Sequence, residues 1–149
     1  RMHDNLLELT RHPGIWGHYV WAMFDFAADA RREGGKNGIN DKGLVTYDRK
    51  VRKDAFYYYK AQWNPEPMVH ICSKRDTERN EAVTDVKVYS NCKNPVLTVN
   101  GKAYALENKG HNTWVATGVQ LKQGANEAIV VTDEGATDSC GWVFVANKN

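Results

Sequence analysis

The N-terminal part of the chain pairs a short amphipathic segment with a dense apolar one. Residues 4–11 carry three leucines among polar side chains at helical spacing, which predicts a helix that ends at the breaker in residues 12–14. Residues 15–26 follow as a nearly continuous apolar run, which is typical of a strand buried on both faces of a parallel sheet. We therefore expect a helix, a breaker and a buried strand, the order of a parallel α/β layout.

A polar stretch and a second helix follow the apolar run. Residues 27–43 are polar and interrupted by glycine, which predicts a long functional loop. Asp48 is a good N-cap for a helix over residues 50–63, whose apolar and aromatic side chains recur at helical spacing. Two closely spaced prolines, Pro65 and Pro67, end this helix and predict a domain boundary.

Beyond Pro67 the pattern changes to short alternating strands separated by turn residues. Seven strands are predicted, over residues 68–74, 84–90, 96–99, 102–106, 113–120, 126–132 and 139–146. Asn100-Gly101 is the dipeptide that favours a type I′ hairpin. This spacing predicts an immunoglobulin-like β-sandwich, with Trp114 and Trp142 in the core between its sheets.

The two patterns together predict a mainly β chain with two domains. Residues 66–149 form the predicted β-sandwich, and residues 1–65 form an α/β segment. One buried strand and two helices cannot close a sheet or bury an aromatic helix face by themselves. The 149 residues therefore correspond to one small domain and a remnant of a larger α/β domain.

Charge and hydropathy limit the partners of the chain. The 20 basic and 18 acidic residues give a net charge of +2, which is too balanced to predict binding to nucleic acid or to an anionic membrane. The basic cluster at residues 49–53 is interpreted as a solvated helix face. No apolar run reaches membrane-spanning length, and the N-terminus lacks a signal-peptide pattern and resembles a cut. The compartment stays open, and a periplasmic or secreted parent protein is compatible with the sequence.

The cysteines and histidines predict no metal site. Cys72, Cys92 and Cys140 have no CxxC spacing, and the five histidines show no ligand spacing. No cofactor is therefore expected. Reduced, structural thiols are the preferred interpretation, although Cys72 and Cys140 fall in predicted strands and could pair by geometry.

Three ordered blocks, in residues 20–26, 38–50 and 53–63, match a known family in sequence and spacing. They resemble the last strand, loop and helix of the catalytic (β/α)₈ barrel of glycoside hydrolase family 2. That family includes β-galactosidases, β-glucuronidases and β-mannosidases. Residues 84–91 and 97–102 resemble, more weakly, the immunoglobulin-like domain that follows the barrel in bacterial β-galactosidase-like members.

The resemblance implies a parent enzyme that degrades carbohydrate by retaining hydrolysis of β-galactosides or related β-glycosides. In that reaction one glutamate protonates the leaving oxygen and a second attacks the anomeric carbon. Neither glutamate motif is present here, because Glu8 lies in the first predicted helix and Glu33 in the predicted loop. The chain is thus expected to be an inactive C-terminal fragment without catalytic residues. Its implied partners are the carbohydrate substrate and the remainder of the enzyme, and a homo-oligomer is compatible.

The resemblance also implies the residues that contact the substrate. In the family, the tryptophan that matches Trp21 lies under the sugar in its subsite, so Trp21 is interpreted as a stacking platform. The resemblance also implies a cis peptide bond between Trp21 and Ala22 in the full enzyme, which could relax to trans in this chain. Asn40 and Lys42 stand where β-glucuronidases carry an Asn-x-Lys pair that holds a uronate carboxylate, but β-galactosidases carry the same run, so the sugar stays open. Asp25 is a weaker candidate, for which a structural carboxylate is the preferred interpretation.

Two functions stay open for the sandwich. In the first it is a structural accessory at the end of a glycosidase, and in the second it is a carbohydrate- or partner-binding module in its own right. Binding of simple sugars to residues 67–149 alone would favour the second.

Overall fold

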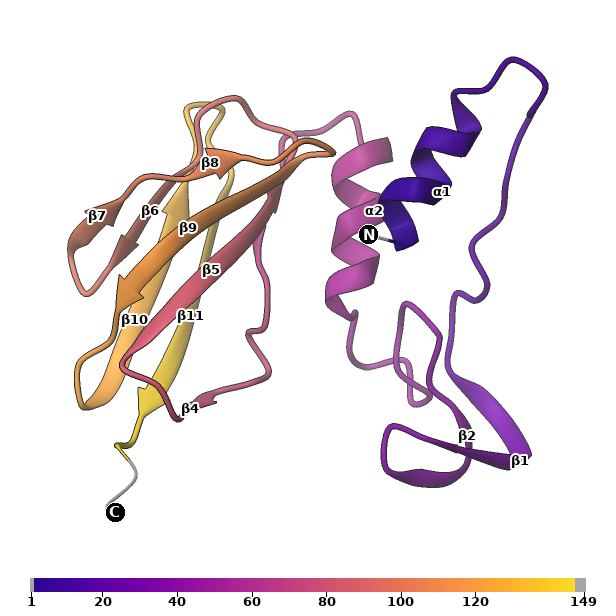
Figure 1. Ribbon diagram of the computed structural model, residues 1–149, viewed down its shortest axis with the longest axis horizontal. Coiled ribbons are helices and arrows are strands. Elements are labelled where there is room, and N and C mark those ends of the chain that lie inside the picture. Colours follow the sequence, from indigo (N-terminus) through magenta and orange to yellow (C-terminus); the bar gives the residue numbers. More distant parts are fainter. Residues whose placement is uncertain (1, 147–149) are drawn as a thin grey trace. The chain divides into compact units, whose positions relative to one another are not determined.

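Residues 2–146 are described by the computed structural model, and they are mainly β-structure (Figure 1). The chain divides into two units, Arg1–Phe56 and Tyr57–Asn149, so the division falls inside a helix. The predicted domain boundary between residues 65 and 66, with residues 1–65 as the end of a glycosidase barrel, stays a prediction. No helix within residues 2–146 is long and apolar enough to cross a bilayer.

The first unit begins with the predicted helix and continues into a β-hairpin. Helix α1 (Met2–Thr10) occupies the predicted segment. Strands β1 (Phe26–Glu33) and β2 (Lys36–Asn40) pair antiparallel, so most of the predicted loop over residues 27–43 is a hairpin and the loop prediction is wrong there. Gly34 and Gly35 connect the strands with φ of 58° and 73°, a backbone region that glycine adopts without steric cost. The glycines that suggested a loop thus make a tight turn.

The buried strand predicted over residues 15–26 is wrong. This segment is irregular up to residue 25, and Trp16 and Tyr19 are 93% and 90% exposed. Only its end is paired, through a parallel bridge between Phe24 and Val45 and through the pairing of Phe26 with Asn40. A strand buried on both faces needs neighbours along its edges and layers over its faces. The described residues pair with this segment only at its C-terminal end.

The second helix is shorter than predicted, because residues 47–49 form a turn that lets Val45 and Arg52 make an antiparallel bridge. Helix α2 (Asp54–Trp63) starts four residues later than the pattern indicated. The carboxylate of Asp48 caps a turn instead, accepting hydrogen bonds from Thr46 Oγ1 at 2.6 Å and from the Lys50 N–H at 3.1 Å. The predicted N-cap is therefore wrong. Aspartate side chains bond to turn backbone as readily as to helix N-termini.

The second unit is a sandwich of two sheets, which Figure 1 shows face to face. One sheet has the order β4 (Glu78–Arg79), β11 (Thr137–Phe144), β10 (Gly124–Val131), β6 (Val96–Val99), β7 (Lys102–Tyr104). The other has the order β3 (Val69–Ile71), β5 (Val83–Ser90), β9 (Thr113–Gln120), β8 (Glu107–Asn108). Neighbouring strands are antiparallel except for β4 beside β11. The predicted immunoglobulin-like sandwich and its seven strands are confirmed, and β4 and β8 are additional.

The core of the sandwich comes from alternate residues of facing strands. Its largest fully buried side chain is Trp142 on β11, as predicted. Trp114 is only partly buried at the margin of this core, and its indole N–H donates to the Ser90 carbonyl at 3.3 Å. The β6–β7 hairpin turns at Asn100 and Gly101, whose φ values of 51° and 80° fit the predicted type I′ turn.

The aromatic face of α2 packs on the sandwich from Tyr57 onward. The Tyr57 ring stacks on the His70 imidazole of β3 with centroids 3.7 Å apart. The Tyr58 ring meets Tyr89 of β5 edge-on at 5.4 Å. Two amides fix the helix further, Gln62 Nε2 donating to the His111 carbonyl and Asn112 Nδ2 to the Ala61 carbonyl. The buried aromatic face that the sequence predicted therefore has its partner within the same unit.

Adjacent positions of β6 offer a matched test of the core. Leu97 is 0% exposed and Val96 is 46% exposed. We expect Leu97→Ala to lower the free energy of unfolding by about 2–5 kcal/mol, because it leaves a cavity. The neighbouring Val96→Ala should change it by less than about 1 kcal/mol. Urea unfolding followed by circular dichroism measures both, and equal losses would contradict the placement of Leu97 in the core.

Candidate functional site

The residues singled out by the resemblance lie around a short loop, residues 41–43, in the first unit. Asp25 is its buried anchor, although it sits at the end of an irregular, largely exposed segment. Its Oδ1 accepts hydrogen bonds from the Gly43 N–H at 2.9 Å and from Lys53 Nζ at 2.7 Å. This geometry gives Asp25 the structural, hydrogen-bonding role. Contact between Asp25 and substrate stays a prediction.

Lys53 binds both the Asp25 carboxylate and the loop backbone. Its Nζ also donates to the Asp41 carbonyl at 2.6 Å. The side chains of Lys53 and Asp25 are only 19% and 8% exposed, so the ion pair is largely desolvated. Removing one partner of such a pair typically costs about 3–5 kcal/mol, because it strands the other charge. The pair therefore fixes the peptide groups on both sides of Lys42.

The basic cluster at residues 49–53 precedes α2, so it is not a helix face, although Arg49, Lys50 and Arg52 are exposed as expected. Lys53 is committed to Asp25. The Arg49 guanidinium lies 4.1 Å from the centroid of the Phe24 ring and donates to the Asp25 and Tyr47 carbonyls at 3.2 and 2.7 Å. The prediction failed because these residues precede the helix. A carboxylate inside an apolar run was the one sequence signal that a cation had to come from elsewhere in the chain.

Gly43 is required by the close approach of two backbone segments. A Cβ atom at this position would lie 2.1 Å from the Asp25 nitrogen and 2.2 Å from the Phe24 carbonyl carbon. Backbone atoms cannot move aside as a flexible side chain can. The loop therefore reaches the Asp25 carboxylate only because residue 43 has no side chain.

Asn40 and Lys42 emerge from this anchored loop with different exposure. Asn40 ends β2, is buried, and accepts the Lys42 N–H on its Oδ1 at 3.0 Å, which makes an Asx turn. The Lys42 side chain is 55% exposed, and its Nζ lies 3.2 Å from Glu33 Oε1. The ammonium is thus presented at the surface from a fixed backbone.

Glu33, at the end of β1, is a site residue that the sequence analysis did not select. Its Oε2 accepts the Asp41 N–H at 3.3 Å, and its Oε1 lies 3.3 Å from Arg31 Nη1 as well as close to Lys42. Burial raises the pKa of this carboxyl group, but the hydrogen bonds from Lys42 and Asp41 and the charges of Lys42 and Arg31 outweigh burial, and the net pKa is lowered. Glu33 is therefore a carboxylate at neutral pH.

Trp21 presents an open aromatic ring near this loop. The indole is 76% exposed, and the peptide bond to Ala22 is cis, as the resemblance implied. Its ring meets the Phe26 ring edge-on, with centroids 6.0 Å apart. Phe26 in turn pairs with Asn40 across the β1–β2 hairpin. Phe26 therefore contacts Trp21 and lies beside Asn40. Substrate contact by Trp21, Asn40 and Lys42 stays a prediction.

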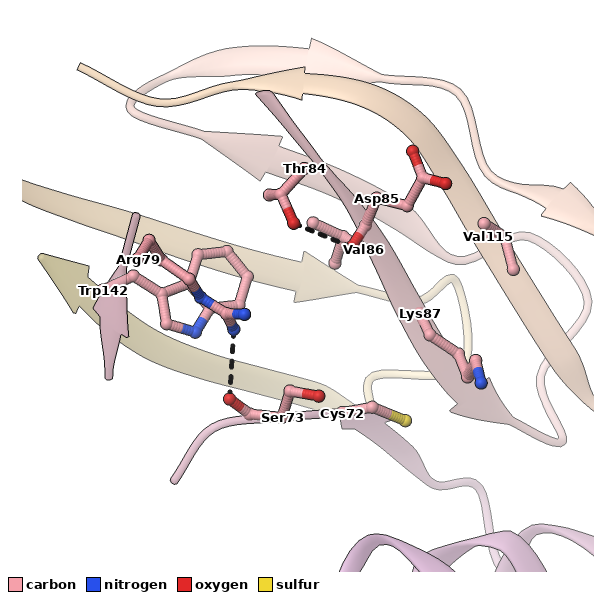
Figure 2. Close-up of a pocket in the computed structure, with 9 residues that line it drawn as sticks. All are labelled: Cys72, Ser73, Arg79, Thr84, Asp85, Val86, Lys87, Val115 and Trp142. Carbon is pink, nitrogen blue, oxygen red and sulfur yellow. Dashed lines mark hydrogen bonds between the residues drawn. The ribbon is translucent and has the colours of Figure 1, made fainter. Parts of the chain in front are cut away.

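A separate cavity of about 260 Å³ lies in the sandwich and is drawn in Figure 2. Arg79 covers the Trp142 ring, with Cζ 4.8 Å from the centroid, so the cavity offers no open aromatic face for a sugar. Among the described residues, Arg79 Nε and Trp142 Nε1 have no acceptor. The positive lining groups, Arg79 and Lys87, are opposed by Asp85 in the lining and by Asp76, 3.4 Å from Arg79. The charges around the cavity balance, and we assign it no ligand.

No cluster of three or more His, Cys, Asp and Glu side chains that could hold a metal ion occurs in the described part of the chain. Cys140 carries a free thiol, so the disulfide with Cys72 that the strand positions allowed is not formed. Burial is the main reason that the pKa of Cys140 rises to about 11, and Asp138 adds to this rise, while Lys74 and Arg79 oppose it. The Cys140 thiol is therefore protonated and unreactive at neutral pH.

Comparison with known proteins shows that the chain is similar to part of several glycoside hydrolases. These relatives are of the β-glucuronidase and β-galactosidase kind, as the resemblance implied. It is 43% identical over 131 residues to a β-glucuronidase of Bacteroides fragilis, a match that covers 87% of this chain and 19% of that protein. No family model matches the chain.

Solved structures give the same result for the fold. A crystal structure of an FMN-binding β-glucuronidase from Faecalibacterium prausnitzii L2-6 is 41% identical with a TM-score of 0.86, and the match covers 99% of this chain and 23% of that one. A putative β-galactosidase from Bacteroides fragilis is 34% identical with a TM-score of 0.86, over 99% of this chain and 23% of that one. The chain spans about a fifth of the length of the curated relative described above.

The lowered pKa of Glu33 predicts how acid affects the loop. Because the folded-state pKa lies below the ordinary value of 4.5, the Lys42–Glu33 contact stabilises the fold above that value and is lost as pH falls through the folded-state pKa. Carboxyl ¹³C NMR should give a Glu33 midpoint below 4.5. Lys42→Gln should raise this midpoint more than Arg31→Gln does. A wild-type midpoint at or above the ordinary value would contradict the contact.

Proposed function

We propose that the chain is a segment of a retaining β-glycoside hydrolase of family 2, with β-glucuronides as its first candidate substrates and β-galactosides as the alternative. The observation that carries the proposal is the exposed ammonium of Lys42 beside Asn40, on a backbone fixed by the Asp25–Lys53 pair. The relatives named β-glucuronidase support it, as does the putative β-galactosidase. An ammonium and an amide are suitable donors for the carboxylate of an acidic sugar.

In this proposal the first unit supplies binding groups and no acid or nucleophile. A general acid needs a raised pKa so that it holds its proton near neutral pH. The pKa of Glu33 is lowered instead, and its carboxylate is engaged by Lys42. Glu8 lies on α1 in an exposed ion pair with Arg11. The two glutamates of the retaining reaction would therefore come from the rest of the enzyme.

Trp21 would supply the apolar floor of the sugar subsite. Its ring is largely exposed and is supported edge-on by Phe26, so one face is available for stacking. A sugar ring presents C–H groups to an aromatic face, and the indole offers the largest such face. Lys42 and Asn40 would then hold the polar end of the same sugar. Orientation of the glycosidic bond follows from holding both ends.

The irregular segment over residues 15–24 would face the remainder of the enzyme. Trp16 and Tyr19 are almost fully exposed, and Ile15 and Met23 are also exposed. A contiguous run of large exposed apolar side chains is uncommon on a complete soluble surface and marks an interface. Strands of a (β/α)₈ barrel would be the partner in this proposal. A homo-oligomer stays a prediction.

The sandwich has less support as a carbohydrate-binding module. Its two largest aromatic side chains, Trp114 and Trp142, pack in or against the core. Tyr104 uses its hydroxyl oxygen to accept the Gln120 N–H, and the Lys102 ammonium lies 5.1 Å from its ring centroid. A structural role beside α2 fits these contacts better. Binding of simple sugars to residues 67–149 alone remains the test of the alternative.

The proposal predicts that the purified chain hydrolyses no β-glycoside. Without an acid and a nucleophile on opposite sides of the scissile bond, the remaining groups cannot protonate and attack together. Release of p-nitrophenol from the aryl β-glucuronide and β-galactoside should equal the buffer rate. Turnover that scales with chain concentration and co-purifies with the chain would contradict the proposal.

Two variants in the full-length enzyme that carries this segment should separate the binding roles. Trp21→Ala should reduce kcat/KM for the aryl β-glucuronide and the β-galactoside alike, by about 100-fold or more, because both lose the stacking floor. Lys42→Gln should cost about 10- to 100-fold on the β-glucuronide, the effect of one charge-assisted hydrogen bond. Its effect on the β-galactoside should stay within about threefold.

The two variants serve as controls for each other. Circular dichroism must show both proteins folded. Kinetics of Trp21→Ala close to wild type would return Trp21 to a packing role. Equal losses on both substrates for Lys42→Gln would argue against recognition of a carboxylate by Lys42.

A further inference from the structure

Two ion pairs lie at the loop of residues 41–43, and they differ in burial and in length. Lys53 and Asp25 are 2.7 Å apart and largely buried. Lys42 and Glu33 are 3.2 Å apart, and the Lys42 side chain is 55% exposed. The first distance is that of a strong charge-assisted hydrogen bond, whereas the second is long for one. The Asp25–Lys53 contact is therefore the stronger of the two, and the Lys42–Glu33 contact the weaker.

The Asp25–Lys53 pair forms hydrogen bonds with the loop backbone and none with the Lys42 side chain. Lys53 binds the carbonyl of residue 41, and Asp25 binds the N–H of residue 43. The Lys42 N–H is bound by the Asn40 side chain. The ammonium of Lys42 can thus exchange one partner for another while the loop backbone stays in place.

Glu33 holds that ammonium loosely. All three contacts of its carboxylate, with Lys42, Arg31 and the Asp41 N–H, measure 3.2 to 3.3 Å. Lys42 and Arg31 are both more than half exposed, so water competes for each contact. Any carboxylate that approaches Lys42 from solvent offers the same chemical group that Glu33 offers.

We propose that Glu33 is an internal competitor at the carboxylate-binding group: its carboxylate contacts the Lys42 ammonium until a ligand carboxylate replaces it. The inference rests on the proposed function, because it assumes that Lys42 receives the carboxylate of an acidic sugar. A neutral sugar has no group that can displace Glu33. The exchange breaks and forms only ionic contacts, and no proton or covalent bond moves.

The test uses the complete 149-residue chain and sodium D-glucuronate as the probe, with D-galactose at matched ionic strength as the neutral comparison. Backbone amide NMR of Asp41 and Lys42 reports binding. Glu33→Gln removes the competing charge and keeps the shape of the side chain. Asp29→Asn is the matched control, since it removes one negative charge from the same strand, β1, at an exposed position without a contact to Lys42.

We expect Glu33→Gln to strengthen glucuronate binding about two- to fivefold, the factor that one exposed ion pair contributes to an equilibrium. Asp29→Asn should leave binding unchanged, and neither variant should respond to galactose. Weaker binding in Glu33→Gln, an equal gain in Asp29→Asn, or no response of Glu33→Gln up to about 200 mM glucuronate, far above any specific affinity, would each overturn the inference.

A third variant separates this inference from the proposed function. Lys42→Gln should abolish the response to glucuronate. If it does so while Glu33→Gln gives no gain, Lys42 is the carboxylate ligand and the role of Glu33 is wrong. If Lys42→Gln binds glucuronate as well as the wild-type chain does, the carboxylate role of Lys42 in the proposed function is wrong, and the inference about Glu33 falls with it.

Discussion

The buried ion pair between Asp25 and Lys53 is the interaction on which the first unit depends. It joins residues that lie 28 positions apart in the sequence and closes the loop between them from both sides. A desolvated pair of this kind adds little stability compared with an apolar contact, but losing half of it is costly. What it supplies is a defined geometry. Lys42 is positioned by that geometry, because hydrogen bonds from the pair hold the peptide groups on both sides of it, and the Asn40 side chain holds its N–H.

The fold of the sandwich could be predicted because its signals are local. Alternation of apolar side chains marks each long strand, and Asn100-Gly101 specifies its turn without reference to the rest of the chain. Strands β4 and β8 have two residues each and leave no alternation to detect. The apolar run over residues 15–26 misled for another reason. A run of apolar residues indicates that a segment is buried in the functional protein. It does not indicate whether the residues that bury it belong to the same chain.

The candidate site was predictable only in part. The resemblance selected Trp21, Asn40 and Lys42, which are identified by type and spacing. Lys53 and Glu33 escaped it, because their roles depend on distances between residues 28 and nine positions apart. Such contacts belong to the folded chain and leave no periodic trace in the sequence. The buried charge of Asp25 was a usable clue, since an isolated carboxylate in an apolar run must find a cation.

The absence of a side chain at Gly43 restricts how this loop can change during evolution. Every single-nucleotide change that replaces this glycine introduces a Cβ where the backbone of Phe24 and Asp25 already lies. Asn40 is constrained in another way, because its buried side chain holds the Lys42 N–H. The exposed Lys42 side chain meets neither constraint. New sugar preferences can therefore arise by exchanging the side chain at position 42 while the surrounding loop keeps its structure.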